Sequence, residues 1–401
     1  MKKRLLLLGG ADIQVDAIKS AQKLNYYVIT CDYLPSNPGH KIADEYHNVS
    51  TTDLDGVLAL AKKLNIDAIS SYASDPGALT AAYVSDKLGI PGNSFESVKN
   101  VSDKVIFRSI QRELKINYPF FDEVYSEDEL RAFLDNHKGK NFIIKPVDSS
   151  GSKGVFIINN ESEDLGKKFK SAFDFSRAKK VIVEENLIRD GKLLTGDVVI
   201  QDHKIIFSCY GDVHFNNSLN GLVPRSVSLP SSKSDAFLEQ ANIDLEKIFK
   251  HQNITTGVFN VDVLEVAGKG PYIIDIGARN GGNLLNNIFS MRSGIDLISI
   301  SMKQHFNDPI TPEELVTNPS GFFAHYVLHS TKDGLFQKIA FSAELESKII
   351  YKSIRPRQGD EVKTFINSSF RIGLLLLSFD TFEEMHSLLN NMYKHVNLIL
   401  K

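Results

Sequence analysis

Strands and helices alternate through the N-terminal part of the chain, and this alternation constrains the fold more than any other feature. The apolar run RLLLL at 4–8 predicts a buried strand, and YYVITCD at 26–32 and IDAISSY at 66–72 predict two more. Apolar residues at helical spacing separate these strands, with helices predicted around 53–64 and 77–88. Strands that alternate with helices form a parallel sheet with right-handed crossover connections.

Two glycine-containing segments follow predicted strands. Gly9 and Gly10 lie after the first strand, but GGADIQ lacks the third glycine of a GxGxxG dinucleotide fingerprint. We therefore interpret the pair as a tight turn. Asp75-Pro76-Gly77 closes the third strand, where open α/β sheets bind ligands, although a simple turn is the favoured interpretation.

The rest of the chain suggests further domains, since 401 residues are more than one hydrophobic core usually serves. The segment 97–114 predicts a charged amphipathic helix that begins at Ser102 and buries Ile106, Ile110 and Leu114. The first domain is therefore predicted to end near residue 95. Mixed strands and helices follow to about residue 305, and a small α+β cap is expected at 306–401.

Charge and cysteine content exclude several classes of protein. The net charge of −3 and the absence of long like-charged runs argue against a broad nucleic-acid-binding face. Cys31 and Cys209 have no CxxC spacing, so neither a disulfide framework nor a structural zinc site is indicated. The apolar runs at 5–8 and 372–377 are too short for a signal peptide or a membrane span. We expect a cytoplasmic protein without nucleic-acid or membrane partners.

The segment FIIKPVDSSGSKGV, residues 142–155, predicts an anion-binding loop. A strand delivers Lys145, and Pro146 ends regular pairing. The serines and glycines between Ser149 and Gly154 leave the backbone N–H groups of this loop without bulky neighbours. These N–H groups can therefore converge on a phosphate. A mobile surface loop with a solvated lysine is the alternative. The segment is not a Walker A loop, because its lysine precedes the glycines.

A predicted hairpin at 257–277 carries two aspartates. A two-residue loop at Gly268-Lys269 would place Asp262 directly opposite Asp275 on the same face. Like charges in directly opposed positions destabilise a sheet unless something neutralises them. Two carboxylates together with phosphate oxygens are a common way to hold Mg²⁺, so the pair is a candidate metal site. A water-facing pair is the alternative.

An arginine follows the second strand of this hairpin. Arg279 lies between small residues, just before Gly281-Gly282. Beside a metal-carboxylate pair, such a guanidinium can hold phosphoryl or carboxylate oxygens with two hydrogen bonds. Together with the lysine-bearing loop, these residues point to transfer of a nucleotide phosphoryl group.

In the order of these motifs, the chain resembles the ATP-grasp superfamily from its first domain through residue 305. The similarity is to its carboxylate–amine/thiol ligases, including amino-acid ligases and members like carbamoyl-phosphate synthase. The resemblance implies a mixed α/β and α+β fold. A Rossmann-like domain at 1–95 would precede an ATP-grasp domain at 96–305, with lobes at about 96–180 and 181–305, and the α+β cap at 306–401.

The resemblance also assigns expected roles to residues that match the family motifs. Lys104 in SDKVIFR and Lys145 match the nucleotide-binding lysines, and Arg279 matches the arginine at the reacting groups; Lys145 and Arg279 are the expected catalytic residues. Asp262 and Asp275 match the metal ligands. The loop and the adenine-binding hinge in VIVEENL add the expected ATP contacts Ser149, Ser150, Gly151, Ser152, Lys153, Gly154, Glu184, Glu185, Asn186 and Leu187. The expected substrate contacts are Arg279, Gly281, Gly282, Asn283 and Arg225.

Some positions depart from the family pattern. The metal ligands are commonly glutamates, and the amide that often completes their site is replaced by Gly277. An acidic residue that often binds the ribose would fall near Leu193, which cannot do so, and Asp197 or Glu185 could substitute. These departures concern metal geometry and ribose contacts rather than the ATP clamp.

The resemblance implies an ATP-dependent carboxylate–amine ligase. It would form an amide bond through an acyl phosphate and release ADP and phosphate, using ATP and Mg²⁺, with Mn²⁺ as a substitute. Its substrates would be a small-molecule carboxylic acid and an amine, and the family leans towards homodimers. The alternatives are a bicarbonate-using carboxylase of the purine-pathway type and a non-catalytic ATP-binding module.

Overall fold

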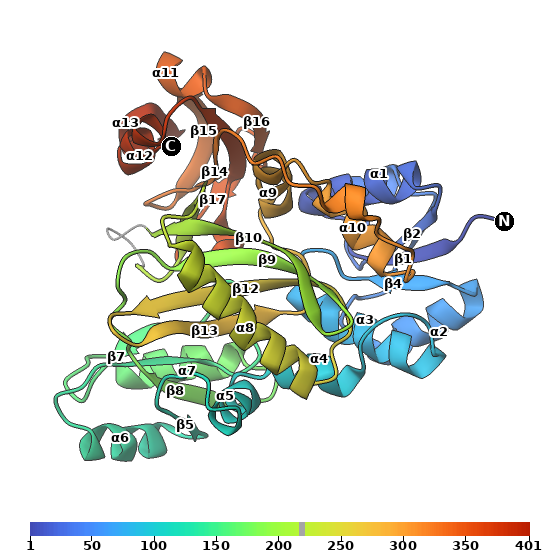
Figure 1. Ribbon diagram of the computed structural model, residues 1–401. Coiled ribbons are helices and arrows are strands. Elements are labelled where there is room, and N and C mark those ends of the chain that lie inside the picture. The colour runs from blue at the N-terminus through green and yellow to red at the C-terminus, as the bar shows by residue number, and fades with distance from the viewer. Residues whose placement is uncertain (216–220) are drawn as a thin grey trace.

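The N-terminal part of the chain forms a parallel sheet of four strands. The computed structural model describes residues 1–215 and 221–401. The order in this sheet is β3-β2-β1-β4, and every neighbouring pair is parallel, so the predicted parallel sheet is confirmed (Figure 1). The sequence did not indicate β3. The strands are β1 (Arg4–Leu8), β2 (Tyr27–Cys31), β3 (Glu45–His47) and β4 (Ala68–Ser70).

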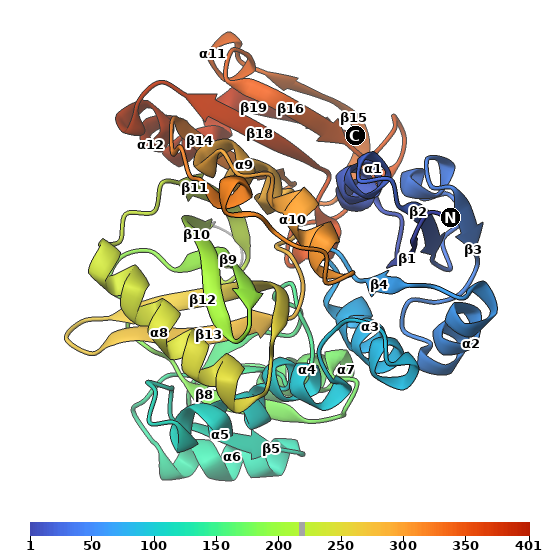
Figure 2. The ribbon, with the colours of Figure 1, turned by 45° about the vertical axis from the view of Figure 1, so that its right-hand side comes forward.

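Helices cover both faces of this sheet because alternate side chains of β1 point in opposite directions. Leu5 and Leu7 pack with α1 (Val15–Lys23) and α10 (Leu297–Gln304), which lie side by side in Figures 1 and 2. Leu6 and Leu8 pack against α2 (Leu54–Leu64) and α3 (Asp75–Leu88) on the other face. Asp75-Pro76-Gly77 opens α3 behind the N-cap Ser74, so its interpretation as a simple turn is wrong.

The helix predicted at 97–114 is two helices, α4 (Phe95–Ser102) and α5 (Lys104–Glu113). Asp103 separates them and caps α5 by accepting hydrogen bonds from the Val105 and Ile106 backbones, so Ser102 is not the cap. The predicted buried stripe is also partly wrong, because only Ile110 of its three residues is buried. The residues of α5 that are buried are Lys104, Phe107, Arg108, Ile110 and Gln111.

A small antiparallel sheet follows, in the order β5-β8-β6-β7. Two helices cover one of its faces, and Phe142 and Ile144 of β6 point into the core between them. The strands are β5 (Phe121–Val124), β6 (Phe142–Pro146), β7 (Phe156–Ile158) and β8 (Val181–Glu185), and the helices are α6 (Glu127–Asn136) and α7 (Leu165–Phe175).

The largest sheet has eight strands in the order β13-β12-β9-β10-β11-β14-β18-β16. The helix α8 packs on one face, and α9 on the other. Strands on both sides of residue 305 belong to this sheet, and the domain boundary predicted there stays a prediction. The bounds are β9 (Leu194–Gln201), β10 (Lys204–Phe215), β11 (Pro224–Leu229), α8 (Asp235–His251), β12 (Thr256–Val266), β13 (Gly270–Gly277), α9 (Leu285–Ser293), β14 (Phe322–Leu328), β16 (Ile349–Ile354) and β18 (Gly373–Phe379).

The C-terminal part adds a three-stranded sheet in the order β17-β15-β19, so its α+β character is confirmed.

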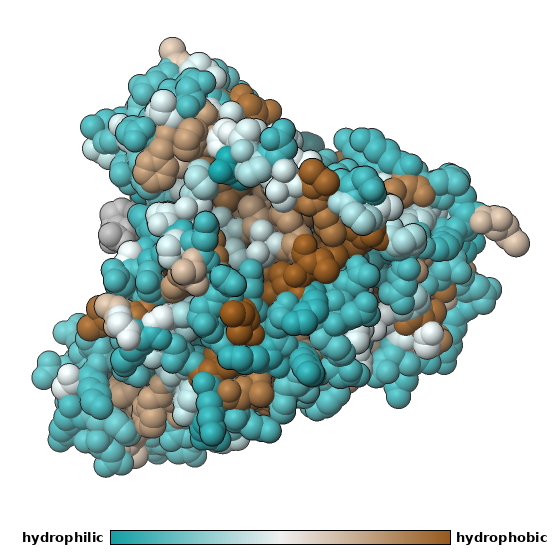
Figure 3. Space-filling model, viewed as in Figure 1, coloured by the Kyte–Doolittle hydropathy of each residue, from teal (hydrophilic) through white to brown (hydrophobic). Residues whose placement is uncertain are grey.

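Hydrophilic residues cover most of the face shown in Figure 3. Within the described ranges, no helix has the length and apolar character needed to cross a membrane. The remaining elements are β15 (Gly334–Phe341), α11 (Ala343–Glu346), β17 (Glu361–Val362), α12 (Phe382–Asn390), α13 (Met392–His395) and β19 (Val396–Leu400).

Candidate active site

A cavity of about 510 Å³ lies between the small sheet and the large sheet. Its apolar wall comes from both sheets, with Ile143 of β6, Ile157 of β7 and Leu264 of β12 among the lining side chains. Such a wall suits a flat aromatic group. Of the predicted site residues, the cavity brings together Lys104, Lys145, Ser149, Ser150, Gly151, Ser152, Glu184, Glu185, Asn186, Leu187, Asp262, Asp275 and Asn283.

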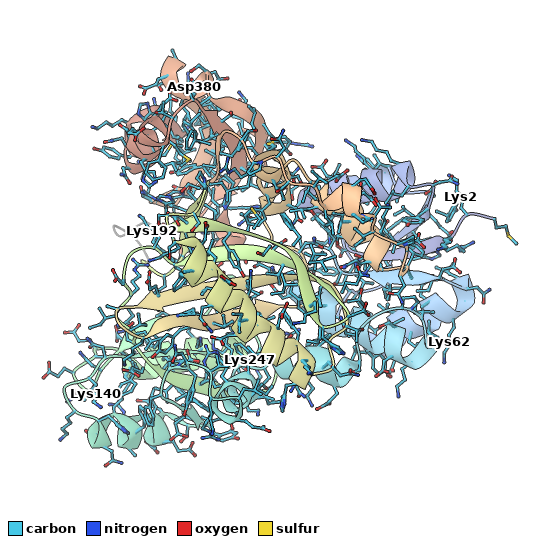
Figure 4. All side chains as sticks on the ribbon, viewed as in Figure 1. Lys2, Lys62, Lys140, Lys192, Lys247 and Asp380 are labelled. Atoms are coloured by element: carbon cyan, nitrogen blue, oxygen red, sulfur yellow. The ribbon has the colours of Figure 1, made fainter. Side chains whose placement is uncertain are left out.

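Two of the cavity's cations are buried lysines. Figure 4 shows Lys2, Lys62 and Lys140 at the outside of the molecule, whereas Lys104 and Lys145 are each 7% exposed. Burying a charged group costs free energy unless the group has partners. The two buried lysines are therefore candidate functional residues, unlike lysines at the surface.

Each buried lysine has a carboxylate partner. The Nζ atom of Lys145 lies 2.6 Å from Glu184 Oε2. The Nζ atom of Lys104 lies 3.4 Å from Asp275 Oδ2 and donates a hydrogen bond to the Ser149 carbonyl at 3.2 Å. Burial lowers the pKa of Lys145, although the Glu184 carboxylate opposes this shift. The two ammonium groups therefore enter the cavity from different elements, the start of α5 and the end of β6.

The serine- and glycine-rich loop closes one side of the cavity. Ser368 donates its backbone N–H to the Gly151 carbonyl at 3.3 Å, and the Ser152 hydroxyl donates to the Leu222 carbonyl at 2.9 Å. Gly151 has a φ of +69°, which only glycine adopts readily. Lys153 and Gly154 continue the loop but are not among the residues that line the cavity. The loop thus bridges the small sheet and the C-terminal part of the chain.

The carboxylates of β12 and β13 lie where the sequence predicts them, but for a different reason. Asp262 pairs with Asp275 in the antiparallel register, as predicted. The predicted two-residue hairpin loop is wrong, because Val266 pairs with Gly270 around a three-residue loop. A β-bulge between the loop and the aspartates inserts Ile274 and moves the register by one residue, which restores the pairing.

The opposed carboxylates create an excess of negative charge. Burial, and then the charge of Asp275, raise the pKa of Asp262 to about 6. In the parts of the chain that the structure describes, no three His, Cys, Asp or Glu side chains are grouped to hold a metal ion by themselves. Two acidic ligands that need a counter-charge do fit a divalent cation whose other ligands are phosphate oxygens and water.

Asp262→Asn is expected to stabilise the metal-free protein at neutral pH. Since the pKa of Asp262 rises from 3.8 to about 6 on folding, the folded state retains a proton that the unfolded state loses between these values. The stability of the metal-free protein therefore falls by about 1–2 kcal/mol as the pH rises through this window, after allowance for partial exposure. Thermal unfolding at pH 4 and pH 8 measures the effect. An identical pH dependence in both proteins would contradict it.

Arg279 is held by a residue that the sequence left unassigned. Its Nε and Nη2 atoms lie 2.8 Å from the two carboxylate oxygens of Asp75, at the start of α3. Burial alone would raise the pKa of Asp75, but Arg279 lowers it below its usual value. A second cavity joins this pair to Lys104, Asp262 and the loop. The position of Asp75 after a strand of a parallel sheet was the signal that could have identified it.

The loop after Arg279 is fixed by Asp197 on β9. This carboxylate is fully buried and accepts hydrogen bonds from the Gly281 backbone, Asn260 and Asn286. With its oxygens engaged there, Asp197 is a poor substitute for the missing ribose ligand, whereas Glu185 lines the cavity.

The predicted substrate contacts separate in the structure. Asn283 lines the main cavity and accepts a hydrogen bond from Arg371. Arg371, which the sequence did not identify, also pairs with Asp12 at 3.0 Å and links the C-terminal part to the N-terminal sheet. Arg225 lies apart from the cavity wall, with Nη2 3.5 Å from the Leu389 carbonyl of α12. Its predicted role in substrate binding stays a prediction.

Known proteins resemble this chain in sequence and in fold. Residues 101–283 match the family model described as the ATP-grasp domain. A formate-dependent phosphoribosylglycinamide formyltransferase of Prochlorococcus marinus (strain NATL1A) is 26% identical over 185 residues, 46% of this chain and 47% of that protein. The chain thus spans about half the length of the first curated relatives it matches.

Two further similarities extend over more of the chain. A phosphoribosylamine–glycine ligase of Methanococcus maripaludis (strain C7 / ATCC BAA-1331) is 25% identical over 309 residues, 69% of this chain and 67% of that protein. The crystal structure of an L-amino acid ligase from Bacillus licheniformis superimposes with a TM-score of 0.82 and 17% identity, covering 100% of this chain and 99% of that one. The latter similarity establishes the fold.

Proposed function

We propose that this protein is an ATP-dependent carboxylate–amine ligase, because residues 101–283 match the family model of the ATP-grasp domain. In the proposed reaction, a carboxylate oxygen of the acid attacks the γ-phosphorus of ATP and ADP leaves. The amine nitrogen then attacks the acyl carbon and the C–O bond to phosphate breaks. Phosphate leaves with the electron pair of that bond, and the nitrogen loses one proton to give the amide. The observation that carries the proposal is the pairing of Asp262 with Asp275 beside Lys104 and Lys145.

In the first step of the proposed reaction, different residues around the cavity would bind the adenine, the phosphates and the metal ion. Glu185 is the last residue of β8, and Asn186 and Leu187 follow it; their backbone groups can bind the edge of adenine between apolar walls. Lys104 and Lys145 bring positive charge to the phosphates, and the loop at 149–154 covers them with backbone N–H groups. Magnesium or manganese, when bound at Asp262 and Asp275, would neutralise the β- and γ-phosphates.

The second cavity suits the acid and the amine. Arg279 lies there beside Asp75, so one cation and one anion face the place where the acyl phosphate would form. The guanidinium would stabilise charge that develops on the transferred phosphoryl and acyl groups. Two of the relatives above are named as ligases, which supports a reaction between an acid and an amine. We further propose a cytoplasmic homodimer that acts on small molecules.

Trapping with hydroxylamine tests the proposed chemistry. The protein is incubated with Mg-ATP, pools of carboxylic acids and hydroxylamine, and hydroxamate and ADP are measured together. We expect one pool to yield both products in equal amounts, because hydroxylamine intercepts an acyl phosphate. ADP formed only with bicarbonate and an aminoribonucleotide would favour the carboxylase alternative. ATP binding without ADP release in any pool would contradict the ligase and favour a binding module.

A further inference from the structure

The roles proposed above do not explain why the charged side chain of Arg108 on α5 is fully buried. Its guanidinium donates four hydrogen bonds. Nε donates to Glu184 Oε1 at 2.8 Å, and Nη2 donates to the Ile274 carbonyl at 2.6 Å. Nη1 donates to Gln111 Oε1 at 2.7 Å and to the Ile273 carbonyl at 3.3 Å. A buried arginine with this many partners holds several elements in a fixed relation.

Two of these partners, Glu184 and Ile274, line the main cavity of the candidate active site. Glu184, at the end of β8, is the carboxylate that holds Lys145 at 2.6 Å through its other oxygen. Ile274 is the extra residue of the β-bulge that places Asp275 opposite Asp262. Arg108 lies one turn after Lys104 on α5. It contacts Glu184, the partner of Lys145, and Ile274, the residue before Asp275.

The bulge depends on a partner for its carbonyl group. With the three-residue hairpin loop and no bulge, Ile274 would lie opposite Asp262, and the Asp275 side chain would point to the other face of the sheet. The Ile274 carbonyl is partly buried, and a carbonyl that is withdrawn from water without a donor costs free energy. Arg108 supplies that donor, and Gln111 supports it by donating to the Ile273 carbonyl at 3.0 Å.

Glu184 links the same guanidinium to Lys145. Burial alone would raise the pKa of Glu184, but Arg108 and Lys145 lower it, so the carboxylate stays ionised between two cations. Because Arg108 shares this negative charge, Lys145 is only partly neutralised and retains attraction for phosphate.

We propose that Arg108 is a positioning residue that sets the metal-binding geometry of Asp275 through the Ile274 carbonyl and the charge of Lys145 through Glu184. This inference rests on the proposed function for its ligands, ATP and a divalent cation. It does not rest on turnover, because both effects concern nucleotide binding.

Binding of a non-hydrolysable ATP analogue, measured by calorimetry with and without Mg²⁺, tests the proposal. In Arg108→Gln, we expect the gain in affinity on adding Mg²⁺ to fall by about 10–100-fold, as for other side chains that orient metal ligands. Arg108→Lys should retain part of the gain, since an ammonium can still pair with Glu184. The control is Arg112→Gln, because Arg112 is exposed in the last turn of α5 and should leave the gain unchanged.

The outcomes separate this proposal from a purely structural role and from failure of the ligase hypothesis. Equal losses of affinity with and without Mg²⁺ in Arg108→Gln would overturn the positioning role. Wild-type protein that binds Mg²⁺ and nucleotide but forms no hydroxamate would contradict the ligase and leave the binding test valid. The double variant Arg108→Gln/Asp275→Asn should show no further loss of Mg²⁺ dependence than Asp275→Asn alone.

A second variant keeps the test decisive if Arg108→Gln does not fold. Gln111→Met retains Arg108 but removes one support of the bulge and the Gln111 acceptor. We expect a smaller loss of the Mg²⁺-dependent gain in this variant. An unchanged gain in folded Gln111→Met and folded Arg108→Lys would overturn the proposal.

Discussion

Asp275→Asn is expected to lower ATP turnover by about a thousandfold or more. The substitution keeps the size of the side chain but removes one of the two charges that face each other across β12 and β13. It also removes the carboxylate partner of Lys104, whose Nζ lies 3.4 Å from Asp275 Oδ2. ADP release measured over a series of Mg²⁺ concentrations checks the expectation, and excess Mg²⁺ should recover only part of the rate.

The matched control replaces an aspartate far from the cavity. Asp380 lies at the periphery of the C-terminal part, where its side chain is 88% exposed and pairs with Lys348 (Figure 4). Asp380→Asn should leave turnover unchanged, because exposed ion pairs contribute little. If Asp275→Asn kept the wild-type rate and the wild-type Mg²⁺ requirement, the carboxylate pair would not be the metal site.

Arg279→Met is expected to reduce hydroxamate formation by about 10²–10³-fold while nucleotide affinity changes little. Arg279 lies in the second cavity, where its guanidinium would meet the reacting phosphoryl and acyl groups rather than the adenine or the ribose. The loss should therefore appear in kcat. Initial rates at saturating ATP, together with calorimetric nucleotide binding, measure the two quantities separately.

Loss of stability could imitate this result, because the substitution leaves the partly buried carboxylate of Asp75 without its partner. Removing one member of a fully buried ion pair costs about 3–5 kcal/mol, and the cost should be smaller here because the Asp75 side chain is 29% exposed. The double variant Arg279→Met/Asp75→Asn removes both charges and should recover stability but not activity. The exposed Arg131, in a helical ion pair with Glu127, provides the control Arg131→Met. Recovery of activity in the double variant would show that Arg279 supports activity only by neutralising the charge of Asp75.

The residues that sequence reasoning missed have partners that are far away along the chain. Asp75 and Arg279 are 204 positions apart, and Arg371 and Asp12 are 359 apart. Hydrophobic periodicity concerns neighbours within a few turns, so it carries no information about such pairs. For the same reason, the buried face predicted for the segment 97–114 is partly wrong. An amphipathic pattern cannot indicate that a lysine, an arginine and a glutamine will be buried against another sheet.

Local sequence determined the elements that carry the site. Apolar runs separated by helical spacing specify the parallel N-terminal sheet, because strands and helices bury side chains at different periods. The small residues at 149–154 and the lysine before them specify a loop that can approach an anion closely. The order of these motifs was enough to predict the match of residues 101–283 to the ATP-grasp domain model and many of the residues that line the main cavity.

Tertiary structure decided how the two aspartates meet. The sequence places Asp262 and Asp275 opposite each other only to within one residue, since hairpin loops of two and three residues differ by one step in register. The β-bulge at Ile274 sets the register in which Asp262 lies opposite Asp275. Its carbonyl is satisfied by Arg108 from a helix more than 150 positions earlier in the chain, at 2.6 Å. That donor is in place only after α5 has packed against the sheet that contains β13.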